Sequence, residues 1–153
     1  MYKSAIAAIL VASAIVVATP GTSEAATLKS KALSVAKAQK GDPYRDGATG
    51  PNAFDCSGLT YYSYKKAGKT IKRVANDQYN ASKKISASAA QPGDLVFFKR
   101  SSGGKVFHVG MVSKKGYMVH ANAGGYYGRK VIEEKIAPYW DKNFVTVYGS
   151  VRN

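Results

Sequence analysis

The sequence predicts an α+β domain, in which helices come first and a mostly antiparallel sheet of about five strands follows. The chain has 153 residues, 45% of them hydrophobic, which suits one compact domain with its own core. Apolar residues recur at helical spacing before residue 90. After it they form short runs rich in Val, Phe and Tyr, between clusters of Gly and Ser. We find no internal repeat, no linker and no separate binding module, and therefore expect a single domain over residues 26–153.

The first 25 residues have the pattern of a Sec-type export signal. Lys3 gives a positive start, residues 5–18 form a run of small and apolar residues, and Ser23-Glu24-Ala25 matches a cleavage site. The apolar run is shorter than the roughly 20 residues that a membrane span needs, which argues against a membrane anchor. We therefore expect cleavage after Ala25 and a secreted mature chain, in the cell wall or outside the cell, with no membrane span after processing.

Two helices and a weaker third are predicted in the first half of the mature chain. Residues 28–39 place apolar side chains at helical spacing. Asp55 stands where an N-cap is expected, so a helix should begin at Cys56, continue to Ala67 and end at Gly68. Residues 76–83 show a shorter and weaker helical pattern.

Five later segments have the composition of strands: residues 94–99, 106–112, 117–121, 130–136 and 144–151. The second and third are joined by a turn near Lys114-Lys115-Gly116, so we expect a hairpin. These two strands carry the two histidines of the chain, His108 and His120. In such a hairpin the two rings can lie on neighbouring strands, within contact range on one face.

The single cysteine excludes an intramolecular disulfide framework, an iron–sulfur cluster and a multi-cysteine zinc site. A nucleophilic thiol needs a base to take its proton and a third group to orient that base. Cys56, His108 and His120 have the side chains for these three tasks. At the start of a helix, Cys56 should feel the positive end of the helix dipole, which lowers the pKa of a thiol.

Each of these residues also has a simpler interpretation. A lone cysteine is often a small buried side chain, and a lone histidine on a strand is often structural. The three together have donor atoms that suit zinc. A fourth zinc ligand is not evident in the sequence, and a cysteine at a helix start favours the nucleophile, so we expect no metal and no cofactor.

Four segments of the chain, in order, resemble motifs of the NlpC/P60 family of bacterial cell-wall cysteine peptidases. They are Phe54-Asp55-Cys56-Ser57-Gly58-Leu59, Gln91-Pro92-Gly93-Asp94-Leu95-Val96-Phe97-Phe98, His108-Val109-Gly110-Met111-Val112 and Val119-His120-Ala121. Tyr44 matches a family tyrosine near the active site, and Arg73 with Gln78 matches a further pattern. One tetrapeptide alone would not be specific, whereas the ordered combination is.

The resemblance implies a small papain-like fold with a Cys56–His108–His120 triad. Family members typically hydrolyse the bond between D-γ-glutamate and a diamino acid in peptidoglycan stem peptides. The resemblance therefore implies a glutamyl thioester on Cys56, with Tyr44 assisting at the oxyanion. It also makes Asp55, Ser57 and Arg73 candidate substrate-binding residues.

The chain departs from the family pattern at Tyr44-Arg45-Asp46-Gly47, where an aromatic and paired glycines are usual, and at Val74, where Ser or Thr often follows the Arg. Two alternative functions stay open. The first is a related acyl-transfer enzyme, such as a transglutaminase-like or deamidase-like protein, including a secreted toxin. The second is a cationic wall-binding protein without catalysis.

Lys and Arg total 23 against nine Asp and Glu, giving a net charge of +14. The simplest interpretation is a solvated basic surface. The functional interpretation is attraction to anionic wall polymers such as teichoic acids, beside the stem peptides themselves. Export and the lack of a base-reading motif argue against nucleic acid as a partner. The sequence reveals no inhibitor or immunity protein.

Overall fold

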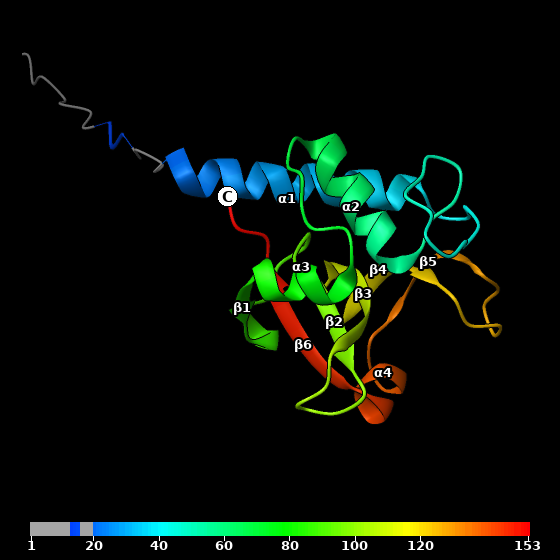
Figure 1. Cartoon of the computed structure of the whole chain (residues 1–153). Coiled ribbons are helices and arrows are strands. Elements are labelled where there is room, and N and C mark those ends of the chain that lie inside the picture. Colours follow the sequence, from blue (N-terminus) through cyan, green and yellow to red (C-terminus); the bar gives the residue numbers. More distant parts are fainter. Residues whose placement is uncertain (1–12, 16–19) are drawn as a thin grey trace, which may run out of the picture.

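The computed structural model describes residues 13–15 and 20–153 (Figure 1). Lys3 and most of the predicted export signal lie outside these residues. Within the described ranges, no helix combines the length and the apolar character that crossing a bilayer requires.

The structure is an α+β fold, as predicted. Four helices are present in the described part of the chain: α1 (Pro20–Ala38), α2 (Cys56–Ala67), α3 (Ala75–Ala81) and α4 (Tyr139–Asn143). The strands are β1 (Lys83–Ile85), β2 (Leu95–Lys99), β3 (Val106–Lys114), β4 (Tyr117–Asn122), β5 (Lys130–Lys135) and β6 (Val145–Ser150), with a short 3₁₀ helix at Ala87–Ala89. They form one antiparallel sheet in the order β1-β6-β2-β3-β4-β5.

The five predicted strands are all present, and the sheet gains a sixth, β1. β1 has three residues, Lys83-Lys84-Ile85, which are too few and too polar to show a strand pattern. It pairs with β6 at the edge of the sheet, where lysines are well tolerated. The weak third helix accordingly ends at Ala81 rather than Lys83.

Helix α1 begins earlier than predicted, at Pro20 rather than residue 28. Glu24, Ala25 and Ala26 are good helix formers although they add nothing to the apolar face, which explains the difference. The fully packed side chains of α1 are Ala32, Leu33 and Ala36. Cleavage after Ala25 would leave this buried face intact.

The sheet is covered on both faces. Helices α1 and α2 lie together over one face (Figure 1), where Leu59 and Tyr64 pack with Leu95 and Phe97 of β2. On the other face, Val96 and Phe98 pack against Trp140 of α4. Strand β2 is therefore apolar along both faces, and the same holds for the centre of β3. This double burial holds rigid the strands that carry the histidines.

Candidate active site

Asp55 caps helix α2, as the sequence predicts. Its Oδ1 accepts a hydrogen bond from the Gly58 N–H at 2.6 Å, and its Oδ2 accepts one from the Gly47 N–H at 3.0 Å. One carboxylate thus holds the first turn of α2 and the preceding loop together. The N–H groups of Cys56 and Ser57 have no partner inside the helix.

The Cys56 sulfur lies at the start of α2 against strand β3. The side chain is half-buried, and burial raises the pKa of the Cys56 thiol. Hydrogen bonds from the backbone N–H of Val109, and from those of Ser57 and Cys56 itself, act in the opposite direction but do not outweigh burial. The predicted lowering of this pKa is therefore wrong for the free protein. The backbone N–H groups at the helix start lower the pKa as expected, but desolvation of the thiolate raises it by more.

The two histidines meet on one face of the β3–β4 hairpin, as predicted. His108 Nε2 and His120 Nδ1 are 2.8 Å apart, and both side chains are buried. Gly110 makes this possible, because a Cβ at that position would lie 3.2 Å from the His120 Cβ and 2.8 Å from the Met118 sulfur. The absent side chain leaves room for the side chains of His120 and Met118.

The chain of polar contacts continues beyond His120 to two residues that sequence reasoning missed. Glu134 Oε1 lies 2.7 Å from His120 Nε2 and accepts a hydrogen bond from Trp140 Nε1 at 3.0 Å. A signal was present in the sequence, because Glu134 is an acidic residue inside a predicted strand of a basic chain. Its contact with His120 depends on the β4–β5 register, which pairs His120 with Ile132 and places Glu134 two residues further along the same face.

These contacts fix which ring nitrogens carry hydrogen. Burial opposes ionisation of Glu134, but hydrogen bonds from His120 and Trp140 outweigh it and lower the pKa of this carboxyl. A carboxylate only accepts, so His120 Nε2 must donate to it, and Nδ1 of neutral His120 is then an acceptor. His108 Nε2 donates to that acceptor. Nδ1 of His108 is left with a free lone pair, which is the state that a general base requires.

His108 is held neutral. Burial lowers the pKa of His108 well below its usual value, and the neighbouring His120 lowers it further. The His108 ring stacks on Trp140, with ring centroids 4.9 Å apart and an angle of 12° between the planes. The indole therefore restrains the imidazole from one side while His120 holds its Nε2.

The structure brings the three predicted substrate-binding residues into one cluster. Arg73 donates to Asp55 Oδ2 at 2.8 Å and to Ser57 Oγ at 2.9 Å. Gln78 stabilises the backbone next to this cluster, because its side-chain amide donates hydrogen bonds to the carbonyl oxygens of Ser57 and Lys72. Asp55 and Ser57 flank Cys56 in the chain, so the cluster lies at the start of α2.

Tyr44 also lies near Cys56, but its hydroxyl is engaged elsewhere. The hydroxyl donates to Asp46 Oδ1 at 3.1 Å. Burial, followed by this hydrogen bond, raises the pKa of Tyr44 to about 12, and Cys56 contributes to the shift. Tyr44 is thus a neutral phenol at all ordinary pH values. Asp46, one of the departures from the family pattern, is the residue that holds it.

The Cys56 sulfur lies against β3, the strand that carries His108, and no hydrogen bond joins the sulfur to the His108 ring. The sulfur contacts the N–H of Val109, which follows His108. Among the described residues, the hydrogen bonds of the His108 ring include the one to His120 and none to Cys56. In the same part of the chain, no three His, Cys, Asp or Glu side chains are grouped as metal ligands would be.

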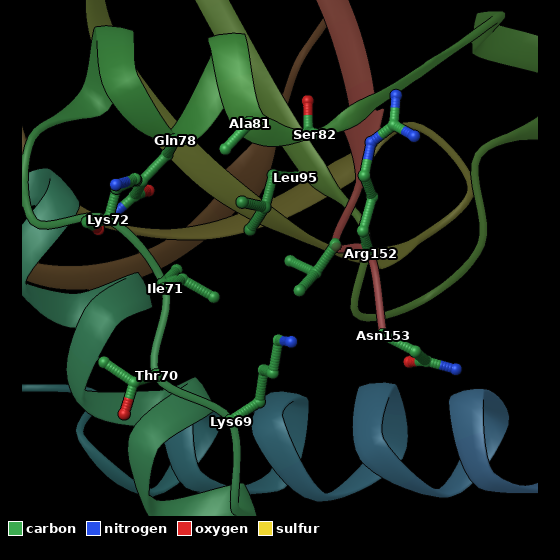
Figure 2. A pocket seen from close by; sticks show the side chains of 11 residues that line it. Lys69, Thr70, Ile71, Lys72, Gln78, Ala81, Ser82, Leu95, Arg152 and Asn153 are labelled. Carbon is green, nitrogen blue, oxygen red and sulfur yellow. The ribbon is translucent and has the colours of Figure 1, made fainter.

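Two cavities flank this region. One, of about 590 Å³, is lined by His108, Glu134 and Trp140 together with the β4–β5 loop. The other, of about 360 Å³, lies between the α2–α3 connection, β2 and the C-terminal residues, and Lys69, Lys72 and Arg152 contribute to its lining (Figure 2). The two cavities share no lining residue.

Comparison with known proteins gives one consistent family. The model of the NlpC/P60 family matches residues 41–149. Over 115 residues, covering 74% of this chain and 33% of the relative, the chain is 46% identical to the "Bifunctional muramidase/DL-endopeptidase CwlT" of Bacillus subtilis. It is 45% identical over 93 residues to the "Probable endopeptidase p60" of Listeria monocytogenes, covering 60% of this chain and 19% of that protein.

Solved structures agree with this match. The crystal structure of the P60 domain of an antigen from Mycobacterium avium subspecies paratuberculosis superposes with a TM-score of 0.70 and 27% identity, covering 84% of this chain and 98% of that domain. By contrast, the chain spans less than half the length of the curated relatives that it matches.

Proposed function

The chain belongs to the NlpC/P60 family, and from that premise we propose that it is a secreted cysteine endopeptidase acting on peptidoglycan stem peptides. The bond is the one between D-γ-glutamate and the diamino acid. The observation that carries the proposal is the hydrogen-bonded series His108–His120–Glu134, which leaves Nδ1 of His108 free on the strand against which Cys56 packs. The DL-endopeptidase relative supports the same bond class.

In the proposed reaction, His108 Nδ1 takes the thiol proton as the Cys56 sulfur attacks the glutamyl carbonyl. The contact between sulfur and imidazole forms when substrate binds, as catalytic hydrogen bonds often tighten only then. The N–H groups of Cys56 and Ser57 stabilise the oxyanion. The imidazolium then gives its proton to the leaving amine, and a thioester remains on Cys56. Water, deprotonated by His108, releases the glutamyl product.

Each remaining residue has a role in this scheme. His120 orients His108, and the anionic Glu134 stabilises the positive charge that develops on the pair. Asp55, Ser57 and Arg73 bind the charged groups of the acyl side of the substrate. Tyr44 assists at the oxyanion once its hydroxyl leaves Asp46. No cofactor is required by any step.

We also propose that the chain is exported and cleaved after Ala25, and that its positive charge draws it to anionic wall polymers. The cavity with Lys69, Lys72 and Arg152 is one basic feature of its surface (Figure 2). Intact-mass measurement of the exported protein should give a chain beginning at Ala26. A mass that retains the first residues would contradict the cleavage.

The first experiment is mass spectrometry of defined muropeptides incubated with the protein and with Cys56→Ala. We expect new ends after D-glutamate with wild type only. If an added amine, rather than water, appears on the glutamyl product, the acyl-transfer alternative is correct. If neither product forms under any condition, both enzymatic functions are wrong and wall binding alone remains.

A further inference from the structure

Trp140 contacts the catalytic histidine, yet the proposed reaction gives it no role. It is the only tryptophan of the chain, lies on the short helix α4 and is 7% exposed. Its ring centroid lies 4.3 Å from that of Phe98 and 5.5 Å from that of Phe144. These two contacts anchor α4 on the sheet and need only a large apolar side chain. Two further contacts of Trp140 need an indole.

The two further contacts join Trp140 to both ends of the histidine series. The indole stacks on the His108 imidazole, with ring centroids 4.9 Å apart and planes 12° from parallel, and its Nε1–H donates to Glu134 Oε1 at 3.0 Å. His120 bridges the same two residues, since its Nε2 lies 2.7 Å from Glu134 Oε1 and its Nδ1 lies 2.8 Å from His108 Nε2. Four side chains therefore form a closed ring of contacts. The carboxylate reaches His108 at its edge through His120 and at its face through Trp140.

The His108 ring has to carry a positive charge during the proposed reaction, in surroundings that disfavour one. The ring is 7% exposed, and burial followed by the neighbouring His120 lowers its pKa. The other titratable groups of the site are Cys56 at the start of α2 and Glu134 on β5. Because the His120 ring stands between Glu134 and His108, the carboxylate does not touch the ring that becomes charged. Direct stabilisation of the imidazolium must come from another contact.

The indole face supplies such a contact. Strand β2 also brings a ring to His108, that of Phe98, but at 6.0 Å and tilted by 35°, whereas the indole is closer and nearly parallel. A tryptophan face attracts a cation within about 6 Å of its centroid, more strongly when water is excluded. A neutral imidazole gains less from the same face. Trp140 therefore favours the imidazolium over the imidazole, the property that accelerates a step in which the imidazolium forms.

We propose that Trp140 is a positioning residue that stabilises the imidazolium form of His108, and that Glu134 acts on His108 through this indole as well as through His120. The proposal rests on the proposed function. In the reaction, the proton moves from Cys56 Sγ to His108 Nδ1 and then to the leaving amine, while Trp140 neither gives nor takes a proton. Its Nε1–H stays bonded to the carboxylate, which makes the indole face more electron-rich.

Fluorinated tryptophan tests the face without changing the fold. Because Trp140 is the only tryptophan, growth on fluorotryptophans alters this residue alone in the full chain. Each fluorine withdraws electrons from the face and adds little volume. Over one, two and three fluorines, we expect kcat for a soluble stem tripeptide to fall stepwise by about 10-fold in total, the size of a desolvated cation–π contact. KM and the unfolding temperature should change little. A constant kcat over the series would overturn the proposal, since a structural role does not depend on ring electrons.

Substitutions separate the contacts of the indole. Trp140→Phe keeps an aromatic face and loses the hydrogen bond to Glu134, whereas Trp140→Leu loses both, so the Phe variant should retain several-fold more kcat. Phe144→Leu is the matched control, because Phe144 packs on Phe107 and Trp140 at the same end of the sheet. It should lower the unfolding temperature and leave kcat unchanged. Equal kcat in the two Trp140 variants, or an equal loss in Phe144→Leu, would mean that only the packing of α4 matters.

A titration without catalysis separates failure of this proposal from failure of the proposed function. The chain has two histidines, so NMR of the imidazole resonances in Cys56→Ala follows the protonation of His108 directly. Because the face favours the charged form, fluorination should lower the His108 pKa by about one unit over the series, which equals the 10-fold change in kcat. A constant pKa together with cleavage by wild type overturns the role of Trp140 alone. A falling pKa without cleavage of any stem peptide overturns the endopeptidase and leaves the stabilised imidazolium.

Discussion

At the scale of the residue, the most informative group is Glu134, because it determines the tautomers of both histidines. Replacing it by Gln keeps the size but removes the negative charge that stabilises an imidazolium. We expect Glu134→Gln to lower kcat by about 10- to 100-fold, less than the loss typical when a residue in direct contact with the catalytic histidine is changed. Because Glu134 does not bind the acyl side, KM for a soluble stem tripeptide should change little.

The control for this prediction is the neighbouring residue. Glu133 is also acidic, but it bonds Lys40 at 3.2 Å on the opposite face of β5. Glu133→Gln should leave kcat unchanged. Glu134→Asp keeps the negative charge and should therefore lower kcat less than Glu134→Gln does. The pH at which activity falls on the acidic side should move in Glu134→Gln and stay fixed in Glu133→Gln. Equal effects of the two Gln variants would indicate a general loss of stability instead.

A second prediction at this scale concerns the ionisation of Cys56. The structure raises the thiol pKa and lowers the imidazole pKa, so the free enzyme holds a thiol beside a neutral base rather than a preformed ion pair. For an acid, a raised pKa means less thiolate at any given pH. Alkylation of Cys56 by iodoacetamide should therefore be slow near pH 6 and rise with pH, at higher pH than for a free cysteine with pKa of about 8.5.

Mass spectrometry after timed alkylation, with glutathione in the same tube as the reference thiol, measures this pH dependence directly.

The pH dependence of activity should differ from that of alkylation. Because His108 acts only when neutral and its pKa is lowered, kcat/KM should persist below pH about 6.5, where an ordinary histidine becomes protonated. Rapid alkylation at mildly acidic pH would show an ion pair and overturn this resting state.

The residues that sequence reasoning found and missed differ in what positions them. Cys56, with its cap Asp55, is placed by local helix signals, and His108 and His120 by a hairpin with a short turn, so their neighbourhood follows from the sequence. The roles of Glu134 and Trp140 depend on the register of β5 and the docking of α4, which come from packing across the sheet. Whether burial or the helix start dominates the pKa of Cys56 can likewise be judged only from the folded structure.

At the scale of the element, Gly58 explains how α2 and the preceding loop fit together. A Cβ at this position would lie 2.0 Å from the backbone oxygen of Ala48 and 2.8 Å from Asp55 Oδ1. Because the first of these is backbone, the loop over residues 44–54 would have to shift. Gly58→Ala should therefore lower stability by about 2–4 kcal/mol, as overpacking and a damaged cap add, and should displace Cys56 from β3.

Thermal unfolding and peptide cleavage measure the two effects together. Gly103→Ala is the matched control, since a Cβ there has no atom within 4 Å. We expect the control to unfold at the wild-type temperature with wild-type activity. An unchanged unfolding temperature in Gly58→Ala would mean that the loop adapts without cost and that the Cys-Ser-Gly sequence needs another explanation.

The sequence predicts some helices and strands and misses others, and the difference is again whether a local pattern exists. Strands β2, β3, β4 and β6 follow from their content of Val, Phe and Tyr, and the edge strand β5 follows from Val131-Ile132 after a Gly-rich turn. Strand β1 and helix α4 have three and five residues, too short for any periodic pattern. The loop over residues 124–128 joins β4 to β5, and its two tyrosines border the cavity beside His108, which no local pattern indicates.

At the scale of the whole molecule, the net charge of +14 predicts how the protein finds its substrate. Attraction to an anionic polymer is long-ranged and screened by salt, whereas the contacts of one stem peptide are short-ranged and partly buried. Raising the salt concentration from about 0.05 M to about 0.5 M shortens the screening length from roughly 14 Å to roughly 4 Å. Binding to walls that retain teichoic acids should therefore fall by at least about 10-fold, and cleavage of a soluble tripeptide should change far less.

Two comparisons isolate the cause of that difference. Walls stripped of phosphate polymers should bind weakly at all salt concentrations, because peptidoglycan alone offers few anionic groups. Lys114→Ser with Lys115→Ser removes two exposed charges at the β3–β4 turn, outside both cavities, and should weaken wall binding without altering tripeptide kinetics. If stripped and intact walls bind equally, or if tripeptide cleavage falls with salt as steeply as wall binding, then the charge does not serve wall attachment and the basic surface is simply solvated.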